Sequence, residues 1–178
     1  MMGSGKSTVG RRLASALGRP FVDADTVLEH RCGVPISTIF ELEGEAGFRR
    51  REAQLIAELA QPCGSVLATG GGAVINPDSR ALLHREGFVI YLQAGVADLW
   101  QRLRRDRGRP LLRTSDPRAR IEALVEQRDS LYREAAHQVI ATGRQPVDRT
   151  VNEIMTALPE DLRHTGSGGA EPIVSDAA

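Results

Sequence analysis

The sequence is poor in lysine, cysteine and aromatic residues, and these shortages narrow the possible classes of protein. Of its 23 lysines and arginines only Lys6 is a lysine, and every other one is an arginine. The two cysteines, Cys32 and Cys63, lie far apart and outside any metal-ligand spacing. We therefore expect free thiols in a reducing compartment rather than a disulfide framework or a zinc site.

Long apolar runs and net charge are also lacking. No stretch approaches the ~18 consecutive apolar residues of a membrane-spanning helix, and no signal peptide opens the sequence. The formal net charge is +0, so no global field draws the protein to nucleic acid or to an anionic membrane. We expect a cytoplasmic protein with neither of these partners, in which any anion site is local.

Short apolar runs alternate with helical patterns, which is typical of an α/β protein with a parallel sheet. The patterns predict one domain over residues 1–158 and a small, polar, disordered tail over residues 159–178. Strands are predicted at 20–23, 65–68, 88–92 and 139–141. Helices are predicted at 6–17, 26–43 with a break near 33–35, 45–59, 77–86, 96–105, 117–135 and 147–158.

A glycine-rich turn with the sequence GSGKST comes directly before the first predicted helix. It matches the second half of the phosphate-loop pattern G-x-x-x-x-G-K-[ST], whose backbone N–H groups and helix N-terminus hold phosphate. The lysine reaches the terminal phosphates and the serine hydroxyl is placed to bind Mg²⁺. The residues predicted to bind ATP here are Gly3, Ser4, Gly5, Lys6, Ser7 and Thr8. A turn that merely begins a helix is the alternative, which the lysine and Ser-Thr in register disfavour.

The first glycine of this pattern would fall one residue before Met1. In doubly wound folds the strand that feeds the phosphate loop is central, and its loss would leave two unpaired edges inside the sheet. We therefore expect the natural protein to carry a further strand upstream, absent from the printed sequence.

Two carboxylates follow the first predicted strand, Asp23 at its end and Asp25 two residues later. In an extended chain both side chains point the same way, toward the sheet edge where ligands bind. One can hold Mg²⁺ through water and the other can accept a hydroxyl proton, although a turn or N-cap role is an equal alternative.

Gly70, Gly71 and Gly72 follow the next strand, which indicates close approach of a ligand or positive φ angles, unless they form a plain flexible turn. Arg49 and Glu52 share a helix face at i, i+3 spacing, so the glutamate can orient an arginine suited to a carboxylate. A solvated helix face is the alternative reading of this charged run.

Four segments together resemble the shikimate kinase family in order and spacing. They are FVDADTVLEHRCGVPISTIFELEGEAGFRRRE, LATGGGAV, GRPLL and QRDSLY, and the likeness extends from Gly3 to about Leu158. The resemblance implies a three-layer doubly wound P-loop kinase with strand order 2-3-1-4-5, a substrate-binding insertion at about 24–55 and a lid at about 104–116. It also implies a monomer that transfers the γ-phosphoryl group of ATP, with Mg²⁺, to the 3-hydroxyl of shikimate.

The resemblance further implies roles for individual residues. Asp25 binds the reacting hydroxyl and accepts its proton, while Asp23 joins Ser7 in the magnesium shell. The carboxylate and ring of shikimate are held by Arg49 and Arg128, with Glu52 and the turn of Gly70, Gly71 and Gly72. The lid arginine is Arg109, which with Lys6 and Asp25 makes up the catalytic set. Adenine packs against Arg102, Arg144 and Pro146.

The residues of the predicted lid segment also indicate a lid, independently of the family resemblance. Residues 104–116 place Gly108, Pro110 and several arginines between two helices, which suits a mobile cationic flap that excludes water and brings Arg109 to the transferred group. An ordinary solvated loop is the alternative.

Three other functions compete. A gluconate or nucleoside-monophosphate kinase of the same architecture is the nearest, but the triple glycine and the carboxylate-binding arginines argue against a second nucleotide. A nucleotide-gated switch would need an Asn-Lys-x-Asp element, which a chain with Lys6 as its single lysine does not contain. A defective or regulatory relative is the third.

Overall fold

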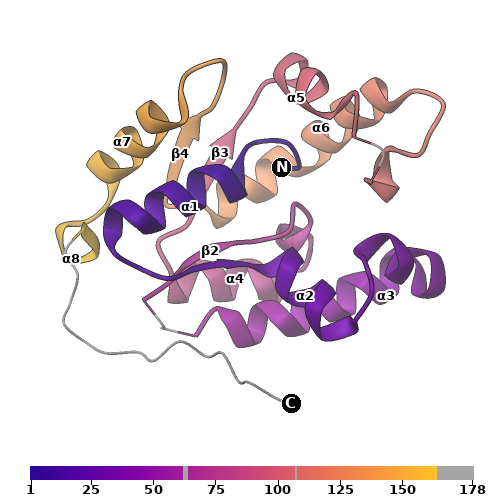
Figure 1. Cartoon of the computed structure of the whole chain (residues 1–178), viewed down its shortest axis with the longest axis horizontal. Coiled ribbons are helices and arrows are strands. Elements are labelled where there is room, and N and C mark those ends of the chain that lie inside the picture. Colours follow the sequence, from indigo (N-terminus) through magenta and orange to yellow (C-terminus); the bar gives the residue numbers. More distant parts are fainter. Residues whose placement is uncertain (62–63, 107, 164–178) are drawn as a thin grey trace.

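The computed structural model describes residues 1–61, 64–106 and 108–163 (Figure 1). Its strands form two parallel pairs. β1 (Phe21–Asp23) pairs with β2 (Val66–Ala68), and β3 (Ile90–Gln93) pairs with β4 (Gln138–Ala141). Helices separate the strands along the chain, so the described residues have a parallel α/β organisation. They do not form one continuous sheet.

Helix α1 (Lys6–Leu17) packs against both strand pairs (Figure 1). Glycines in the left-handed region bound it on either side, Gly5 at φ 93° and Gly18 at φ 61°. Within the helix, a Cβ at Gly10 would lie 2.6 Å from the ring of Phe21. The absence of a side chain there lets α1 approach β1 closely, and this fixes the position of the loop that begins the helix.

The predicted insertion corresponds to two helices at the lower right of Figure 1, α2 (Ala24–Cys32) and α3 (Ile36–Leu59). Helix α3 is kinked at Gly44, where φ is 68° and ψ is −178°, so its two halves match the predicted segments that end at 43 and begin at 45. Because an L residue disfavours that φ, glycine permits the kink. The two helices share a core with the start of η1 (Ala73–Ile75).

The remaining helices follow the predicted order. Asn76 caps α4 by accepting from the Ser79 amide at 2.9 Å, and the helix then begins at Pro77, as predicted. The other bounds are α4 (Pro77–Glu86), α5 (Val96–Leu103), η2 (Pro110–Leu112), α6 (Pro117–Ala135) and α7 (Val147–Ala157). No helix of the described residues is both long enough and apolar enough to cross a bilayer.

One short helix lies where the sequence predicts a disordered tail. Helix α8 (Glu160–Arg163) follows α7, and Arg163 donates hydrogen bonds to the carbonyls of Leu158 and Thr156, both at 2.7 Å. The prediction is therefore wrong for residues 160–163, because these carbonyls at the end of α7 give the arginine two acceptors. Residues 164–178 of the predicted tail lie outside the described residues.

An apolar cavity of about 420 Å³ separates the two strand pairs. The walls are the facing edges of β2 and β3 together with α1 and α7, and they include Val66, Leu67, Ile90, Leu92, Leu13 and Ile154. Among the described residues, no strand pairing joins β2 to β3. Within the described part of the chain, the two halves of the core are therefore joined by helix packing, of α1 on both strand pairs and of α4 on α6, rather than by a ladder of backbone hydrogen bonds.

Candidate active site

The glycine-rich turn wraps around the carbonyl of Met1. Gly3 and Gly5 have φ angles of 73° and 93°, which only glycine adopts readily. The Met1 carbonyl accepts hydrogen bonds from the Ser4 hydroxyl and from Lys6 Nζ, both at 2.8 Å. The turn thus brings the single lysine and successive amides to the N-terminus of α1, where anions bind favourably.

Burial lowers the pKa of Lys6, and the nearby Asp25 carboxylate opposes that shift. The next residue, Ser7, donates a hydrogen bond of 2.6 Å from its hydroxyl to Asp23 Oδ2. This contact joins the loop to the end of β1. Among the predicted loop residues Thr8 is exposed, on the first turn of α1.

The acidic pair differs in backbone from the prediction. Asp23 ends β1, but Asp25 lies in the first turn of α2 rather than in extended chain. Asp23 caps that helix, since its Oδ1 accepts from the Asp25 amide at 3.1 Å. The N-cap reading is thus correct for Asp23, and the two carboxyl groups still line one cavity. Burial raises the pKa of Asp25, while Lys6 opposes the rise.

The cavity has a volume of about 500 Å³ and lies where β1, α2, α3 and the triple glycine meet. All of the acceptor residues predicted from the sequence line it, namely Asp25, Arg49, Glu52, Gly70, Gly71, Gly72 and Arg128, together with Ser7, Asp23 and Arg109. Residues from distant parts of the chain therefore meet in one space.

Arg49 is held in this cavity by two carboxylates. Its Nη1 donates to Glu52 Oε2 at 2.6 Å, as the i, i+3 spacing predicts, and its Nη2 donates to Glu45 Oε1 at 3.0 Å. Glu52 is 5% exposed, and its Oε1 has no hydrogen-bond partner within the part of the chain that the structure describes. Burial raises the pKa of Glu52, and the Arg49 charge opposes that rise. The solvated-face reading is wrong for these two residues.

The triple glycine is explained by close packing. None of the three has a positive φ. A Cβ at Gly70 would lie 2.2 Å from Glu52 Oε1 and 2.9 Å from Asp25 Oδ1, and one at Gly72 would lie 1.9 Å from Arg49 Nη1. The turn therefore touches the side chains predicted to hold the acceptor.

Arg128 comes from α6 and is only 5% exposed. Its Nη1 donates to the carbonyl of Gly71 at 3.3 Å. Arg128 is therefore buried rather than part of a solvated helix face, and it lines the same cavity.

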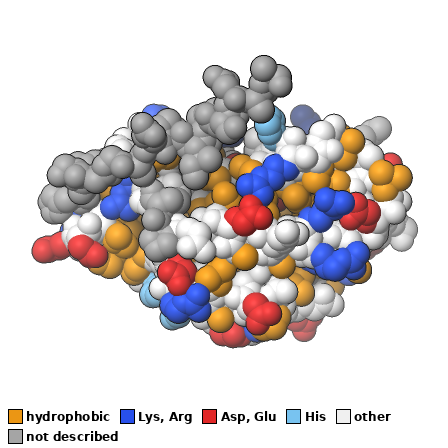
Figure 2. Space-filling view, turned by 90° about the horizontal axis from the view of Figure 1, so that it is seen from below, with side chains coloured by type: hydrophobic (Ala, Val, Ile, Leu, Met, Phe, Trp, Pro, Cys, Tyr) orange, Lys and Arg blue, Asp and Glu red, His pale blue; other side chains and the backbone are white. Residues whose placement is uncertain are grey.

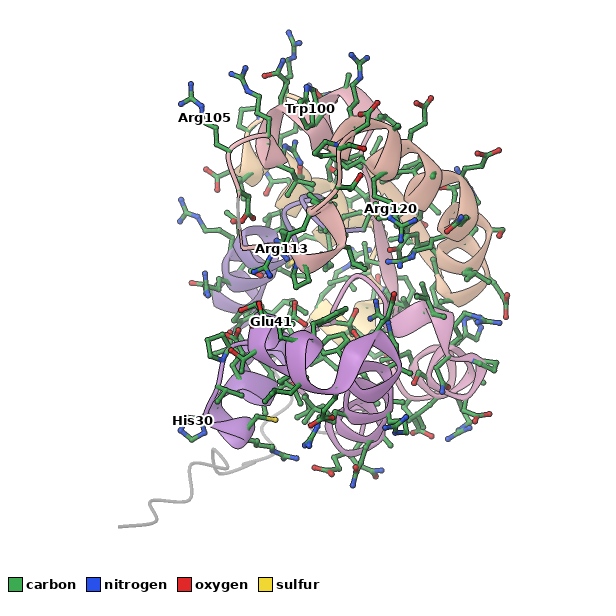
Figure 3. The ribbon with its side chains drawn as sticks, turned by 90° about the vertical axis from the view of Figure 1, so that its right-hand side faces the viewer. His30, Glu41, Trp100, Arg105, Arg113 and Arg120 are labelled. Carbon is green, nitrogen blue, oxygen red and sulfur yellow. The ribbon has the colours of Figure 1, made fainter. Side chains whose placement is uncertain are left out.

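The lid segment supplies Arg109, whose Nε donates to Asp106 Oδ2 at 3.0 Å. The segment is also tied to the insertion across the cavity. Arg113 Nη1 lies 2.8 Å from Glu41 Oε1 on α3, and Figure 3 shows these two side chains directed toward one another. Both partners are exposed, so the link is one that solvent and salt can weaken.

The residues predicted near adenine lie on the other side of the glycine loop. Arg102 donates to the carbonyls of Gly3, at 3.0 Å, and of Gly143, at 2.6 Å. The Arg144 side chain is 91% exposed, and Pro146 stands at the N-cap of α7. None of these three lines the 500 Å³ cavity, so they lie apart from the residues predicted to hold the acceptor.

Charge is mixed on the face that Figure 2 shows, where Lys and Arg side chains lie beside Asp and Glu side chains over the described residues. Three arginines, Arg49, Arg109 and Arg128, line the cavity of a chain whose net charge is +0.

Tyr132 is a site neighbour that the sequence analysis missed. Its hydroxyl donates to the Gly71 carbonyl at 2.5 Å, beside the contact from Arg128. The i, i+4 spacing of these two residues on a predicted helix was the available signal.

A phosphate loop that opens a helix, next to a cavity lined by carboxylates and arginines, is the arrangement of a P-loop phosphotransferase with a small anionic acceptor. Comparison with known proteins gives the particular family. A family model described as shikimate kinase matches residues 2–159. The chain belongs to the shikimate kinase family.

Relatives and solved structures agree with this assignment. A shikimate kinase of Burkholderia pseudomallei is 58% identical over 158 residues, which cover 89% of this chain and 86% of the relative. The structure of a shikimate kinase from Acinetobacter baumannii in complex with shikimate has a TM-score of 0.84 at 42% identity, covering 88% of this chain and 87% of that one. One from Bacteroides thetaiotaomicron has a TM-score of 0.79 at 29% identity, covering 88% and 93%. The predicted family and the α/β P-loop kinase fold are thereby confirmed.

Proposed function

We propose that the protein transfers the γ-phosphoryl group of ATP to the 3-hydroxyl of shikimate, giving shikimate 3-phosphate and ADP on the route to aromatic amino acids. The observation that carries the proposal is the meeting of Arg49, Asp25 and Arg128 in one cavity beside the phosphate loop. A ligand that carries both a carboxylate and an alcohol suits this arrangement. The relative solved with shikimate belongs to the same family.

The acceptor is held by charge and by shape. Arg49 and Arg128 bind its carboxylate, with Glu52 orienting Arg49. The turn of Gly70, Gly71 and Gly72 packs against the ring. The nearby Asp25 takes the hydroxyl proton as the oxygen attacks phosphorus, so that the alcohol O–H bond breaks while the P–O bond to the acceptor forms and the bond to ADP breaks.

The donor is held by the amides of Gly3 to Thr8, with Lys6 on its terminal phosphates and Arg109 closing from the lid. Adenine packs against Arg102, Arg144 and Pro146. Catalysis then comes mostly from positioning and from stabilising the charge that develops on the transferred group.

Two oxygen-bearing side chains near the glycine loop suit a magnesium ion. The hydroxyl of Ser7 and the carboxylate of Asp23 lie 2.6 Å apart, and hydroxyl, carboxylate and water oxygens are the ligands that Mg²⁺ prefers. We propose that these two residues hold it, one directly and one through water. When bound, the ion neutralises phosphate charge.

Residues 1–158 form a single catalytic domain in this proposal, with the insertion at about 24–55 and the lid at about 104–116. We propose a cytoplasmic monomer that binds neither nucleic acid nor membrane.

We propose that the complete sheet has the order 2-3-1-4-5, in which strand 1 is an additional strand upstream of the glycine loop. In the labels of Figure 1 this order is β1, β2, the additional strand, β3, β4, so the additional strand lies between β2 and β3. The apolar cavity between those edges supports it, because the two pairs are parallel and each edge has backbone groups directed toward the gap. Adding an apolar segment of about six residues before the glycine loop should raise the melting temperature and the activity. An extended chain no more stable than the printed one would contradict this strand order.

A coupled assay of ADP release tests the function, run with and without shikimate on both versions of the chain. Gluconate and a nucleoside monophosphate serve as competing acceptors, since kinases of the same architecture use them. Release that depends on shikimate alone supports the proposal. Steady ATP binding without turnover would favour the regulatory relative, and preference for another acceptor would refute the assignment of shikimate.

A further inference from the structure

The Gly71 carbonyl is held by two donors from one face of α6. The Tyr132 hydroxyl lies 2.5 Å from it and Arg128 Nη1 lies 3.3 Å from it. These residues are one helical turn apart, so both can reach a single acceptor. The tyrosine makes the shorter contact, and it is uncharged.

The Tyr132 ring is itself fixed. It is 7% exposed and stacks on Tyr91, with 4.8 Å between the ring centroids and 23° between the ring planes. The Tyr91 hydroxyl donates instead to Asp129, at 2.9 Å. A ring packed on this side has few alternative rotamers, so its hydroxyl presents a donor at a defined position. Burial raises the pKa of Tyr132, which keeps that hydroxyl protonated at neutral pH.

The pinned carbonyl lies in the middle of the turn that shapes the acceptor cavity. On one side of it, Gly70 packs against the carboxyl group of Glu52, and on the other, Gly72 packs against the guanidinium of Arg49. A displacement of this turn by a few tenths of an ångström would therefore be transmitted to both side chains, since close-packed interiors pass on small shifts.

We infer that Tyr132 is a positioning residue of the acceptor site, which fixes the Gly70–Gly72 turn against Arg49 and Glu52 through its hydrogen bond to the Gly71 carbonyl. It touches no reacting atom in this role. The inference rests on the proposed function, because it concerns the same acceptor cavity.

The test is Tyr132→Phe, with Tyr91→Phe as the matched control. Each variant removes one phenolic hydroxyl from the same stacked pair, but only Tyr132 bonds to the glycine turn. We expect Tyr132→Phe to raise the KM for shikimate by about 3- to 10-fold, the effect of one lost hydrogen bond, and to leave the KM for ATP within about 2-fold. For Tyr91→Phe both constants should stay within about 2-fold.

A merely structural tyrosine would give a different result. Thermal unfolding of both variants reports loss of stability separately from loss of acceptor affinity. An unchanged KM for shikimate in Tyr132→Phe, or an equal rise in Tyr91→Phe, would overturn the inference. If neither the unmodified nor the N-terminally extended chain shows shikimate-dependent ADP release, the proposed function itself fails, and this outcome is distinct from the other two.

Discussion

A methyl group added at Gly72 should act on catalysis through Arg49. Gly72 has φ −108° and ψ −4°, a backbone conformation that alanine adopts without strain. Its added Cβ would lie 1.9 Å from Arg49 Nη1 and 2.2 Å from Cζ. Since non-bonded heavy atoms rest about 3.5 Å apart, the guanidinium must move by roughly 1.5 Å.

Such a displacement breaks the geometry that binds a carboxylate. It removes the 2.6 Å contact with Glu52 and carries the arginine out of its place in the cavity. Hydrogen bonds to charged groups contribute about 1.5–3 kcal/mol each, so losing one at the acceptor corresponds to a fall of roughly 10- to 150-fold in kcat/KM for shikimate. The fold should survive, because the displaced atoms are the end of a flexible side chain.

The assay is coupled ADP release, with shikimate titrated at saturating ATP and ATP titrated at saturating shikimate. Only kcat/KM for shikimate should change, and the KM for ATP should not. Gly87→Ala is the control, because its Cβ would meet the Leu83 carbonyl at an ordinary 3.6 Å and its φ is negative. Both variants should keep the circular dichroism spectrum of the unmodified chain.

A double-mutant cycle tests the cause. If the methyl group acts through Arg49, Gly72→Ala should have little further effect in an Arg49→Ala background. Full additivity of the two changes, or wild-type kinetics in Gly72→Ala alone, would refute the assignment of Arg49 to the acceptor carboxylate.

The remaining predictions concern the phosphate loop, the base and the lid. Lys6→Ala should lower kcat by about 100-fold or more with an unchanged circular dichroism spectrum, and wild-type rates in a steady-state assay would contradict the phosphate-loop assignment. Because burial raises the pKa of Asp25, its proton-accepting form is lost at a higher pH than for an ordinary aspartate. The kcat/KM for shikimate should therefore fall with decreasing pH through that raised pKa, and an acid limb at or below the ordinary aspartate value would rule this out. Glu41→Gln removes the partner of Arg113 in an exposed ion pair, so it should change either KM by less than about 3-fold, and the change should vanish at about 0.5 M salt. A larger effect that survives salt would show that the pair does more than tether the lid.

Local signals predicted the helix bounds well. Helix α1 runs from Lys6 to Leu17 as expected, because glycines in the left-handed region stand at both of its ends. The start of α4 follows from Asn76, whose side chain caps the helix. In both cases the residues that decide the boundary lie within a few positions of it, so the sequence alone contains the information.

The triple glycine could be only half interpreted from the sequence. The sequence was compatible with close approach of other atoms and with positive φ angles. The structure shows close approach of side chains to Gly70 and Gly72, and no positive φ at either residue. The atoms that a Cβ would meet belong to α2 and α3, which are remote in sequence. No local pattern indicates which side chain a turn touches.

The contacts between distant elements were not predictable for the same reason. Tyr132 and Gly71 are 61 positions apart, and Arg113 and Glu41 are 72 positions apart. A tyrosine on a helix and a charged loop residue are ordinary features, and only the folded chain brings α6 to the glycine turn and the lid segment to α3. The family resemblance supplied the positions of the arginines but no account of what fixes them.

Burial disfavours the charged form of three titratable groups in the site. Burial lowers the pKa of Lys6 and raises those of Asp25 and Glu52, while the neighbouring opposite charges oppose each shift. A bound polyphosphate would favour the charged form of Lys6, and a bound hydroxyl donating to Asp25 would favour its ionised form. The two ligands would thus offset the desolvation cost of charging these buried groups. Because the fold already holds the groups in place, part of the free energy of orienting them is provided in folding rather than at binding. The two carboxyl groups repel anions, so we expect the attraction for a polyphosphate and for an acceptor carboxylate to come from Lys6 and from the three arginines of the cavity, Arg49, Arg109 and Arg128. The field of a chain whose net charge is +0 cannot supply it.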